Sequence, residues 1–240
     1  MHRQNDVLEL LNEVKINIID LEKKINDAKS DSHISNVLKP KVKTSLEHLR
    51  SCLDFCAKDI FSIVLRPKLG ERNVSYFPYG SNKEEFLKSL KKHGFLLLKN
   101  YDAVIYSLVE SIQPHECRNN WLYNLCRLTN SNKHDRLSTQ KRLDGLALTS
   151  NDKTIVHVDN TSTVVIQNSI FDGKYVERLV LDKGQVALDG LIEDGLSIID
   201  WTEFVFKDSG INIIELITRS SENIDMFQTE LYKLLNGKRI

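Results

Sequence analysis

The stretch VLELLNEVKINIIDLEKKI, residues 7–25, indicates how the first part of the chain folds. Apolar residues recur in it at alternating steps of four and three, which is the spacing of a heptad seam on an α-helix. The opposite face carries charged and polar side chains. The stretch therefore predicts a long amphipathic helix that must pack its apolar face against a partner surface. The seam consists of Val7, Leu11, Val14, Ile18, Leu21 and Ile25.

Helical periodicity continues downstream of this stretch. A second long helix is predicted from Pro40, which is tolerated in a first turn, to the residue before Pro67, which should stop the helix. Because both helices are long and the polar link 29–35 is short, we expect an antiparallel helical hairpin. Ser81 and Glu84 form a capping box for a short third helix. This helix and the remaining ones are expected at 81–94, 100–114, 119–134 and 210–235.

The period of the pattern changes after about residue 143. β-branched residues become frequent and alternate with polar ones in short segments, and the pairs Asp159-Asn160 and Asp172-Gly173 supply turn residues. This pattern predicts a small antiparallel sheet and leaves its strand order open. The expected strands are 154–160, 161–169, 175–182 and 196–208.

Together these patterns predict an α+β protein. It would be mainly an α-helical bundle with a small antiparallel β section inserted before the C-terminal helix. We expect a helical bundle at 1–142 and a β section at 143–208. The C-terminal helix, 209–240, should pack back on the bundle.

The charge balance excludes some classes of function. The chain has 33 basic and 33 acidic side chains, and a zero net charge argues against coating nucleic acid through bulk electrostatics. A local basic site is compatible with this balance. No apolar run reaches the roughly 18 residues needed to span a bilayer, and the charged N-terminus lacks the apolar core of a signal peptide. We therefore expect a cytoplasmic protein.

The four cysteines predict buried structural thiols. Cys52 and Cys56 lie within one helical pattern, and Cys117 and Cys126 flank another. None forms a close C-x-x-C pair, and no His pattern completes a zinc site. The sequence also lacks a Gly-rich phosphate loop and a nucleophile elbow. We expect neither a metal nor a cofactor.

The segment CRLTNSNKHDRL, residues 126–137, is the strongest pointer to function. On an α-helix its Arg127 and His134, seven positions apart, would leave nearly the same face, about 10 Å apart along the axis. Arginine is a permanent cation whose planar fork suits phosphate, and histidine titrates near neutral pH. RNA cleavage without a metal needs a base, an acid and a cation at the phosphate. One such pair cannot fill every role, but two copies meeting across a dimer axis could.

This arrangement resembles the HEPN superfamily of helical-bundle proteins. Its ribonuclease members carry Arg, four to six residues and then His on a bundle helix, and they act as dimers; here the intervening residues are LTNSNK. The resemblance implies a HEPN-like bundle, a homodimer and a metal-independent endoribonuclease in a toxin or antiphage-defence setting. Arg127 would then hold the phosphate, and His134 would act as acid or base. Family members commonly place Asn, Asp or His directly after the Arg, where this chain has Leu128.

A second resemblance covers most of the chain in order. The segments 46–61, 76–80 and 128–134 are similar to a group of uncharacterised bacterial proteins that pair an H-x-R-S-x-x-D-type segment with a later N-x-x-K-H segment. From its spacing, Arg50 can pair with Asp54 four residues later. We expect these two residues and His48 to form a supporting polar cluster between two helices. The matched residues are His48, Arg50, Ser51, Asp54, Asn130, Lys133 and His134.

The basic segment KHDRLSTQKR, residues 133–142, adds a candidate phosphate-contacting patch. Three interpretations stay open for these polar residues. They could be a fold-holding network at a helix end, where cations and Asn are common. They could form an RNA-cleaving site. The chain could also be a non-catalytic dimeric module that binds a ligand, or a protein partner through the β section. The candidate RNA-binding residues are Asn130, Lys133, Arg136, Lys141 and Arg142.

Overall fold

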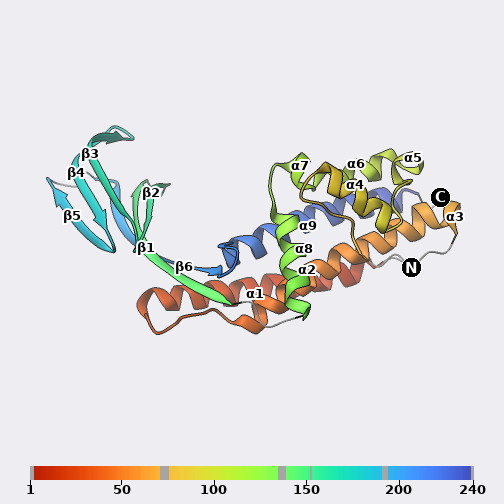
Figure 1. Ribbon diagram of the computed structural model, residues 1–240, viewed down its shortest axis with the longest axis horizontal. Coiled ribbons are helices and arrows are strands. Elements are labelled where there is room, and N and C mark those ends of the chain that lie inside the picture. Colours follow the sequence, from red (N-terminus) through yellow and green to blue (C-terminus); the bar gives the residue numbers. More distant parts are fainter. Residues whose placement is uncertain (1–2, 71–75, 135–138, 152, 191–193, 239–240) are drawn as a thin grey trace. The chain divides into compact units, whose positions relative to one another are not determined.

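A computed structural model describes residues 3–70, 76–134, 139–151, 153–190 and 194–238; for residues 68 and 131–134 it describes the backbone alone. The chain forms two compact units (Figure 1). The helical unit comprises Met1–Leu21, Leu38–Ser138 and Ile213–Ile240, and the β unit comprises Glu22–Val37 and Thr139–Asn212. The expected α+β class is therefore observed, with helices and antiparallel strands in separate units. No helix within the described ranges is long and apolar enough to cross a membrane.

The first two long helices run antiparallel, as their lengths and short link predict. Arg3 bonds the Asp59 carboxylate through its backbone nitrogen and its guanidinium, each at 2.6 Å. Further along the pair, the Cys52 thiol approaches the Val7 carbonyl at 3.7 Å. These helices are α1 (Gln4–Ser30) and α2 (Lys39–Ile60). The predicted seam is largely buried: Val7, Leu11, Val14 and Leu21 are buried, and Ile18 and Ile25 are half-buried.

The prediction that Pro67 stops the second helix is wrong. A π-helical turn, η1 (Phe61–Leu65), follows α2, and the chain then forms α3 (Arg66–Leu69). Pro67 lies in the first turn of α3, where its missing N–H leaves no intrahelical bond unmade. The helical segment instead ends at Gly70, whose φ of 73° suits a residue without a Cβ.

Short helices and a last long one complete the helical unit. The cap of the third helix lies one residue later than predicted, because Asn82 accepts from the Glu85 nitrogen while the Glu85 carboxylate accepts from the Ser81 nitrogen. Pro40 and the final helix agree with their predicted places. The elements are α4 (Lys83–Lys92), α5 (Leu98–Tyr101), α6 (Ala103–Ser111), α7 (Pro114–Cys117), α8 (Trp121–His134) and α9 (Ile213–Asn236).

The last helix, α9, packs within the helical unit. The ring of Phe227 meets Phe77 edge-on at 5.5 Å, and the Tyr232 hydroxyl donates to the buried Asp59 carboxylate at 3.0 Å. Lys15 of α1 forms an ion pair with Asp225 at 2.8 Å. Helix α9 thus contacts α1, α2 and the loop that precedes α4.

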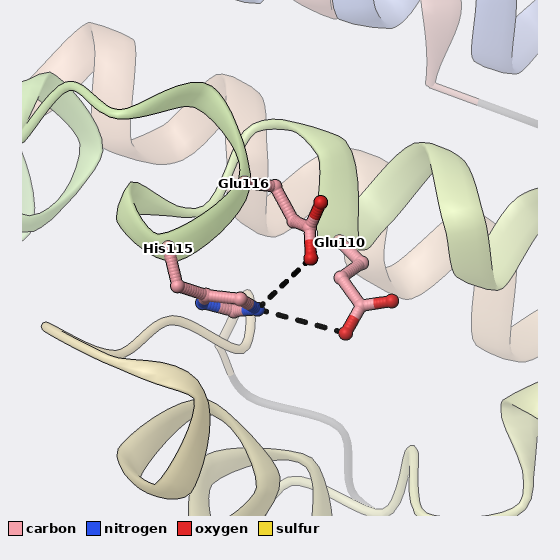
Figure 2. A group of neighbouring side chains, drawn as sticks. All are labelled: Glu110, His115 and Glu116. Atoms are coloured by element: carbon pink, nitrogen blue, oxygen red, sulfur yellow. Dashed lines mark ion pairs between the residues drawn. The ribbon is translucent and has the colours of Figure 1, made fainter.

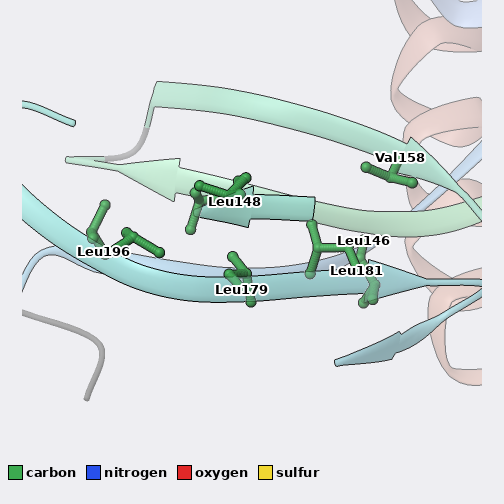
Figure 3. Packing of buried hydrophobic residues seen from close by; sticks show 8 residues of the cluster. Leu146, Leu148, Val158, Leu179, Leu181 and Leu196 are labelled. Carbon is green, nitrogen blue, oxygen red and sulfur yellow. The ribbon is translucent and has the colours of Figure 1, made fainter. Parts of the chain in front are cut away.

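The β unit contains two three-stranded antiparallel sheets. One has the order β2-β1-β6 and the other the order β3-β4-β5. Their facing residues form one apolar core, with leucines and valines from both sheets (Figure 3). The strands are β1 (Gln140–Ser150), β2 (Lys153–Asp159), β3 (Thr163–Phe171), β4 (Lys174–Asp182), β5 (Gln185–Asp189) and β6 (Leu196–Phe206). The sequence predicted four of these strands and missed β1 and β5.

Gly145 shows why β1 gives a weak strand signal. A Cβ at this position would come 2.0 Å from the Val158 carbonyl oxygen and 2.5 Å from the Trp201 ring. Glycine therefore lets the indole lie across the strand, where it stacks on His157 at 3.9 Å. This packing requires glycine at position 145, and glycine lowers the propensity of a segment to form a strand.

The unit boundaries differ from those expected from sequence, because the link between α1 and α2 belongs to the β unit. The backbone nitrogen of Val37 donates to the Gln140 side chain at 2.7 Å, and the Gln140 amide donates back to the Val37 carbonyl at 3.0 Å. Residues 139–142 were expected in the helical bundle. They instead lie in β1 or directly before it, because their hydrogen bonds join 22–37 to the sheet.

Candidate functional site

Helix α8 presents two different faces. Its apolar face is buried, as the periodicity predicts, with Trp121, Leu122, Leu125 and Leu128 inside the helical unit. Arg127 and Asn130 are exposed, and because they are three residues apart they are neighbours on the helix surface. The helix continues without a break to His134, so Arg127 and His134 lie on one helix with the predicted spacing.

Several predicted site residues fall where the structure gives no side-chain detail. The side chains of Lys133 and His134 lie outside the described part of the chain, as does Arg136 entirely. The RNA contacts expected from Lys133 and Arg136 and the acid or base role expected from His134 therefore remain predictions. Asn130 is better defined, because its amide donates to the Tyr79 hydroxyl at 3.1 Å.

The expected pairing of Arg50 with Asp54 is present in a buried polar cluster. Their side chains lie 3.2 Å apart on α2, and the Arg50 side chain is only 5% exposed. The Arg50 guanidinium also donates to the Cys126 sulfur on α8 and, at 3.4 Å, to the Phe77 carbonyl. The Asp54 carboxylate accepts from the Phe77 nitrogen at 2.7 Å. One ion pair thus connects α2, α8 and the segment before α4.

Two tyrosines of that segment cover the guanidinium. The centre of the Arg50 guanidinium lies 5.1 Å from the Tyr79 ring and 5.8 Å from the Tyr76 ring, within cation–π range. Tyr79 is half-buried and also contacts Tyr123 on α8. Tyr76 is exposed and meets His93 edge-on at 5.9 Å. These aromatic rings therefore pack onto the arginine, and the exposed Tyr76 lies on the solvent side of the cluster.

Burial sets the protonation states within this cluster. Burial raises the pKa of Cys126 to about 11 despite the nearby Arg50 cation, so its thiol is neutral near pH 7. Burial, Lys92 and Arg50 lower the pKa of His93. Burial lowers the pKa of Arg50, but the Asp54 carboxylate and the hydrogen bond to Cys126 outweigh burial and raise this pKa overall. Because Cys126 is neutral, we assign the balancing charge to Asp54, and the cluster holds one compensated ion pair.

His48 is the third residue that was expected in this cluster. It lies two residues before Arg50 on α2, so the two side chains leave the helix in different directions, and it is half-buried. Of the expected supporting residues, the structure therefore brings together Arg50 and Asp54. Cys126 is a partner that sequence reasoning missed, because helical spacing does not reveal contacts between helices.

Lys141 and Arg142 belong to the β unit. Lys141 is exposed on β1. Arg142 donates to both Asp144 carboxylate oxygens at 2.9 Å, to the Asp31 and Ile34 carbonyls at 2.7 and 3.0 Å, and to the Ala28 carbonyl at 2.7 Å. These five bonds give its guanidinium a structural role, joining the end of α1 to β1. We therefore leave Arg142 out of the proposed RNA-binding surface.

The structure also assembles a group that sequence reasoning missed. Glu110 at the end of α6 and His115 and Glu116 of α7 place one ligand atom each within 4.8 Å of one another (Figure 2). The expectation of no metal site rested on the absence of the usual Cys and His motifs. The pattern Glu, four residues, His-Glu gives little signal on its own, because its geometry depends on the turn between the helices.

The chain matches no protein-family model, no curated protein and no solved structure.

Proposed function

We propose that this chain is a HEPN-like, metal-independent endoribonuclease that acts as a homodimer. The observation that carries the proposal is that Arg127 is exposed on α8 and that this helix continues unbroken to His134. In this proposal Arg127 holds the scissile phosphate, and His134 exchanges the proton with the ribose hydroxyl or the leaving oxygen. The second protomer supplies the other Arg and His.

The neighbourhood of Arg127 supports a polar contact surface. Asn130 lies one turn further along α8, and its amide is held by Tyr79 at 3.1 Å. Beneath it, Arg50 joins α8 to α2 through Cys126. A catalytic or binding side chain needs a rigid support, and a buried network of this kind provides one. Lys133, Arg136 and Lys141 are proposed as further contacts to the RNA backbone.

A toxin or antiphage-defence role in the cytoplasm follows from the family resemblance and forms part of the same proposal. An endoribonuclease of this kind would arrest growth when its activity is released. Induced expression of the wild-type chain should therefore slow bacterial growth, and the His134→Ala variant should not.

The experiment that tests the proposal incubates the purified chain with mixed RNAs in EDTA. We expect cleavage by the wild type and a fall of about a hundredfold or more in His134→Ala, since general acid–base catalysis contributes about 10²–10⁴. His33, which is exposed in the link between α1 and α2, offers a matched control. His33→Ala should cleave like the wild type. Equal cleavage by wild type and His134→Ala would remove His134 from the mechanism.

A second candidate function is a protein-binding module, favoured by apolar side chains on the β3-β4-β5 sheet. Ile170 is 69% exposed and pairs directly with Tyr175, which is 45% exposed. Val165 on β3 is also exposed. If the wild type cleaves no RNA, this function becomes the leading one. A photoreactive residue at position 170 should then crosslink a protein partner in cells, and one at the exposed Lys153 should not.

A further inference from the structure

The corner between α6 and α7 brings a histidine and two glutamates together. The His115 Nε2 lies 3.6 Å from a Glu110 carboxylate oxygen and 4.0 Å from a Glu116 carboxylate oxygen (Figure 2). Both distances exceed that of a hydrogen bond. Both ring nitrogens of His115 are buried, and neither has a hydrogen-bond partner among the described residues. The imidazole therefore lies within ion-pair distance of two carboxylates without a hydrogen bond to either.

The corner itself is held firmly. Buried Gln113, between the two helices, donates to the carbonyls of Pro78 and Val109 at 3.2 and 3.1 Å and accepts from the Gly80 nitrogen at 3.3 Å. At Gly80 a Cβ would meet the Phe86 nitrogen at 2.3 Å, so only glycine permits this close approach. The turn that places His115 next to Glu110 is thus fixed by buried hydrogen bonds.

We propose that Glu110, His115 and Glu116 bind one divalent first-row metal ion of the Zn²⁺ class. Imidazole and carboxylate ligands together suit Zn²⁺, whose ligands lie about 2.0–2.2 Å from the ion. Ligand atoms around such an ion are about 3–4 Å apart, close to the separations found here. A small movement of Glu116, which is exposed, brings the third ligand into range. Three protein ligands leave at least one position for water.

The Lys83 ammonium would compete with a metal ion for the Glu110 carboxylate. The Lys83 ammonium lies 3.5 Å from the Glu110 oxygen that faces His115, and the Tyr106 hydroxyl donates to that oxygen at 3.1 Å. The Lys83 side chain is 61% exposed and flexible, so it can move aside when an ion binds. Removing this ammonium should strengthen metal binding, whereas removing a ligand should weaken it.

Zn²⁺ titration of the EDTA-stripped full-length chain by calorimetry tests the site, with Zn²⁺ alone as the probe. We expect one ion per chain at this site. Glu116→Gln should weaken binding at least tenfold, because even outer residues that support a metal ligand are worth about 10–100-fold in affinity. Lys83→Met should tighten binding. Glu84→Gln is the matched control, because Glu84 is exposed and pairs with Lys88 on its own helix.

His115→Gln should also abolish binding, and circular dichroism would show whether this buried substitution preserves the fold. Glu116→Gln keeps the test decisive if it does not, because Glu116 is on the surface. Co²⁺ bound in place of Zn²⁺ should give visible absorption that disappears in Glu116→Gln. Absence of Zn²⁺ binding, or equal binding by wild type and Glu116→Gln, would overturn the proposal.

Discussion

The Arg50 guanidinium on α2 lies 3.2 Å from the Asp54 carboxylate and also donates to the Cys126 sulfur on α8. The bond from Arg50 to Cys126 connects α2 and α8, two helices that are far apart in sequence. Removing one partner leaves a buried, uncompensated charge, which costs more than the pair itself contributes. The pair is therefore expected to be a sensitive point of the helical unit.

Arg50→Met and Asp54→Asn should each lower the free energy of unfolding by about 2–4 kcal/mol, and the double variant should lose less than their sum. Denaturant unfolding of the two single variants and the double variant measures this. Arg219→Ala, which removes an exposed partner of Glu215 on α9, should change stability by less than about 0.5 kcal/mol. Fully additive losses would show that the two side chains do not interact.

The cysteines should differ sharply in reactivity. Burial raises the pKa of Cys126 to about 11 and that of Cys52 to about 12, and it raises the pKa of Cys56 well above its usual value. Cys117 is exposed, which corrects the expectation that all four thiols are buried. A thiol reagent at pH 8 should label one cysteine in the native chain and four in guanidinium, and none in native Cys117→Ser. Rapid labelling of a second native thiol would contradict the burial of Cys52, Cys56 and Cys126.

His93 should make stability depend on pH. Its pKa is lowered in the folded chain by burial and by the nearby Lys92 and Arg50 cations. At a pH well above 6.5, the approximate pKa of His93 in the unfolded chain, the ring is neutral in both states. Its titration then does not change the free energy of unfolding. As the pH falls below that value the unfolded chain binds the proton first, so stability decreases. His93→Gln should flatten the loss of unfolding free energy between pH 7.5 and 5.5; an unchanged slope would assign the dependence to other groups.

Arg142 should be essential to the β unit. Lysine keeps the charge but cannot reproduce the five hydrogen bonds of the planar fork. We expect Arg142→Lys to destabilise the unit by about 2–3 kcal/mol, since each net hydrogen bond contributes about 1 kcal/mol and some remain. Hydrogen exchange should become faster at residues 28–37. Arg178→Lys, at an exposed pair with Asp189, is the matched control and should leave exchange there unchanged.

Local sequence patterns predicted the features that depend on neighbouring residues. The buried stripe of α8, the pairing of Arg50 with Asp54 and the turn at Asp172-Gly173 all follow from short-range spacing. The features missed depend on long-range contacts. Strand β1 has few β-branched residues and forms by pairing with β2 and β6. The Cys126 contact and the group around His115 arise only when separate helices meet.

The proposal that α8 cleaves RNA depends on Arg127 as much as on His134. The most direct measurement compares initial cleavage rates of wild type, Arg127→Ala and Arg219→Ala on one RNA in EDTA. We predict a fall of about 10²–10³ for Arg127→Ala, the usual cost of losing a group that stabilises developing charge, and no change for Arg219→Ala. Equal rates for all three proteins, or no cleavage by the wild type, would contradict the proposed nuclease.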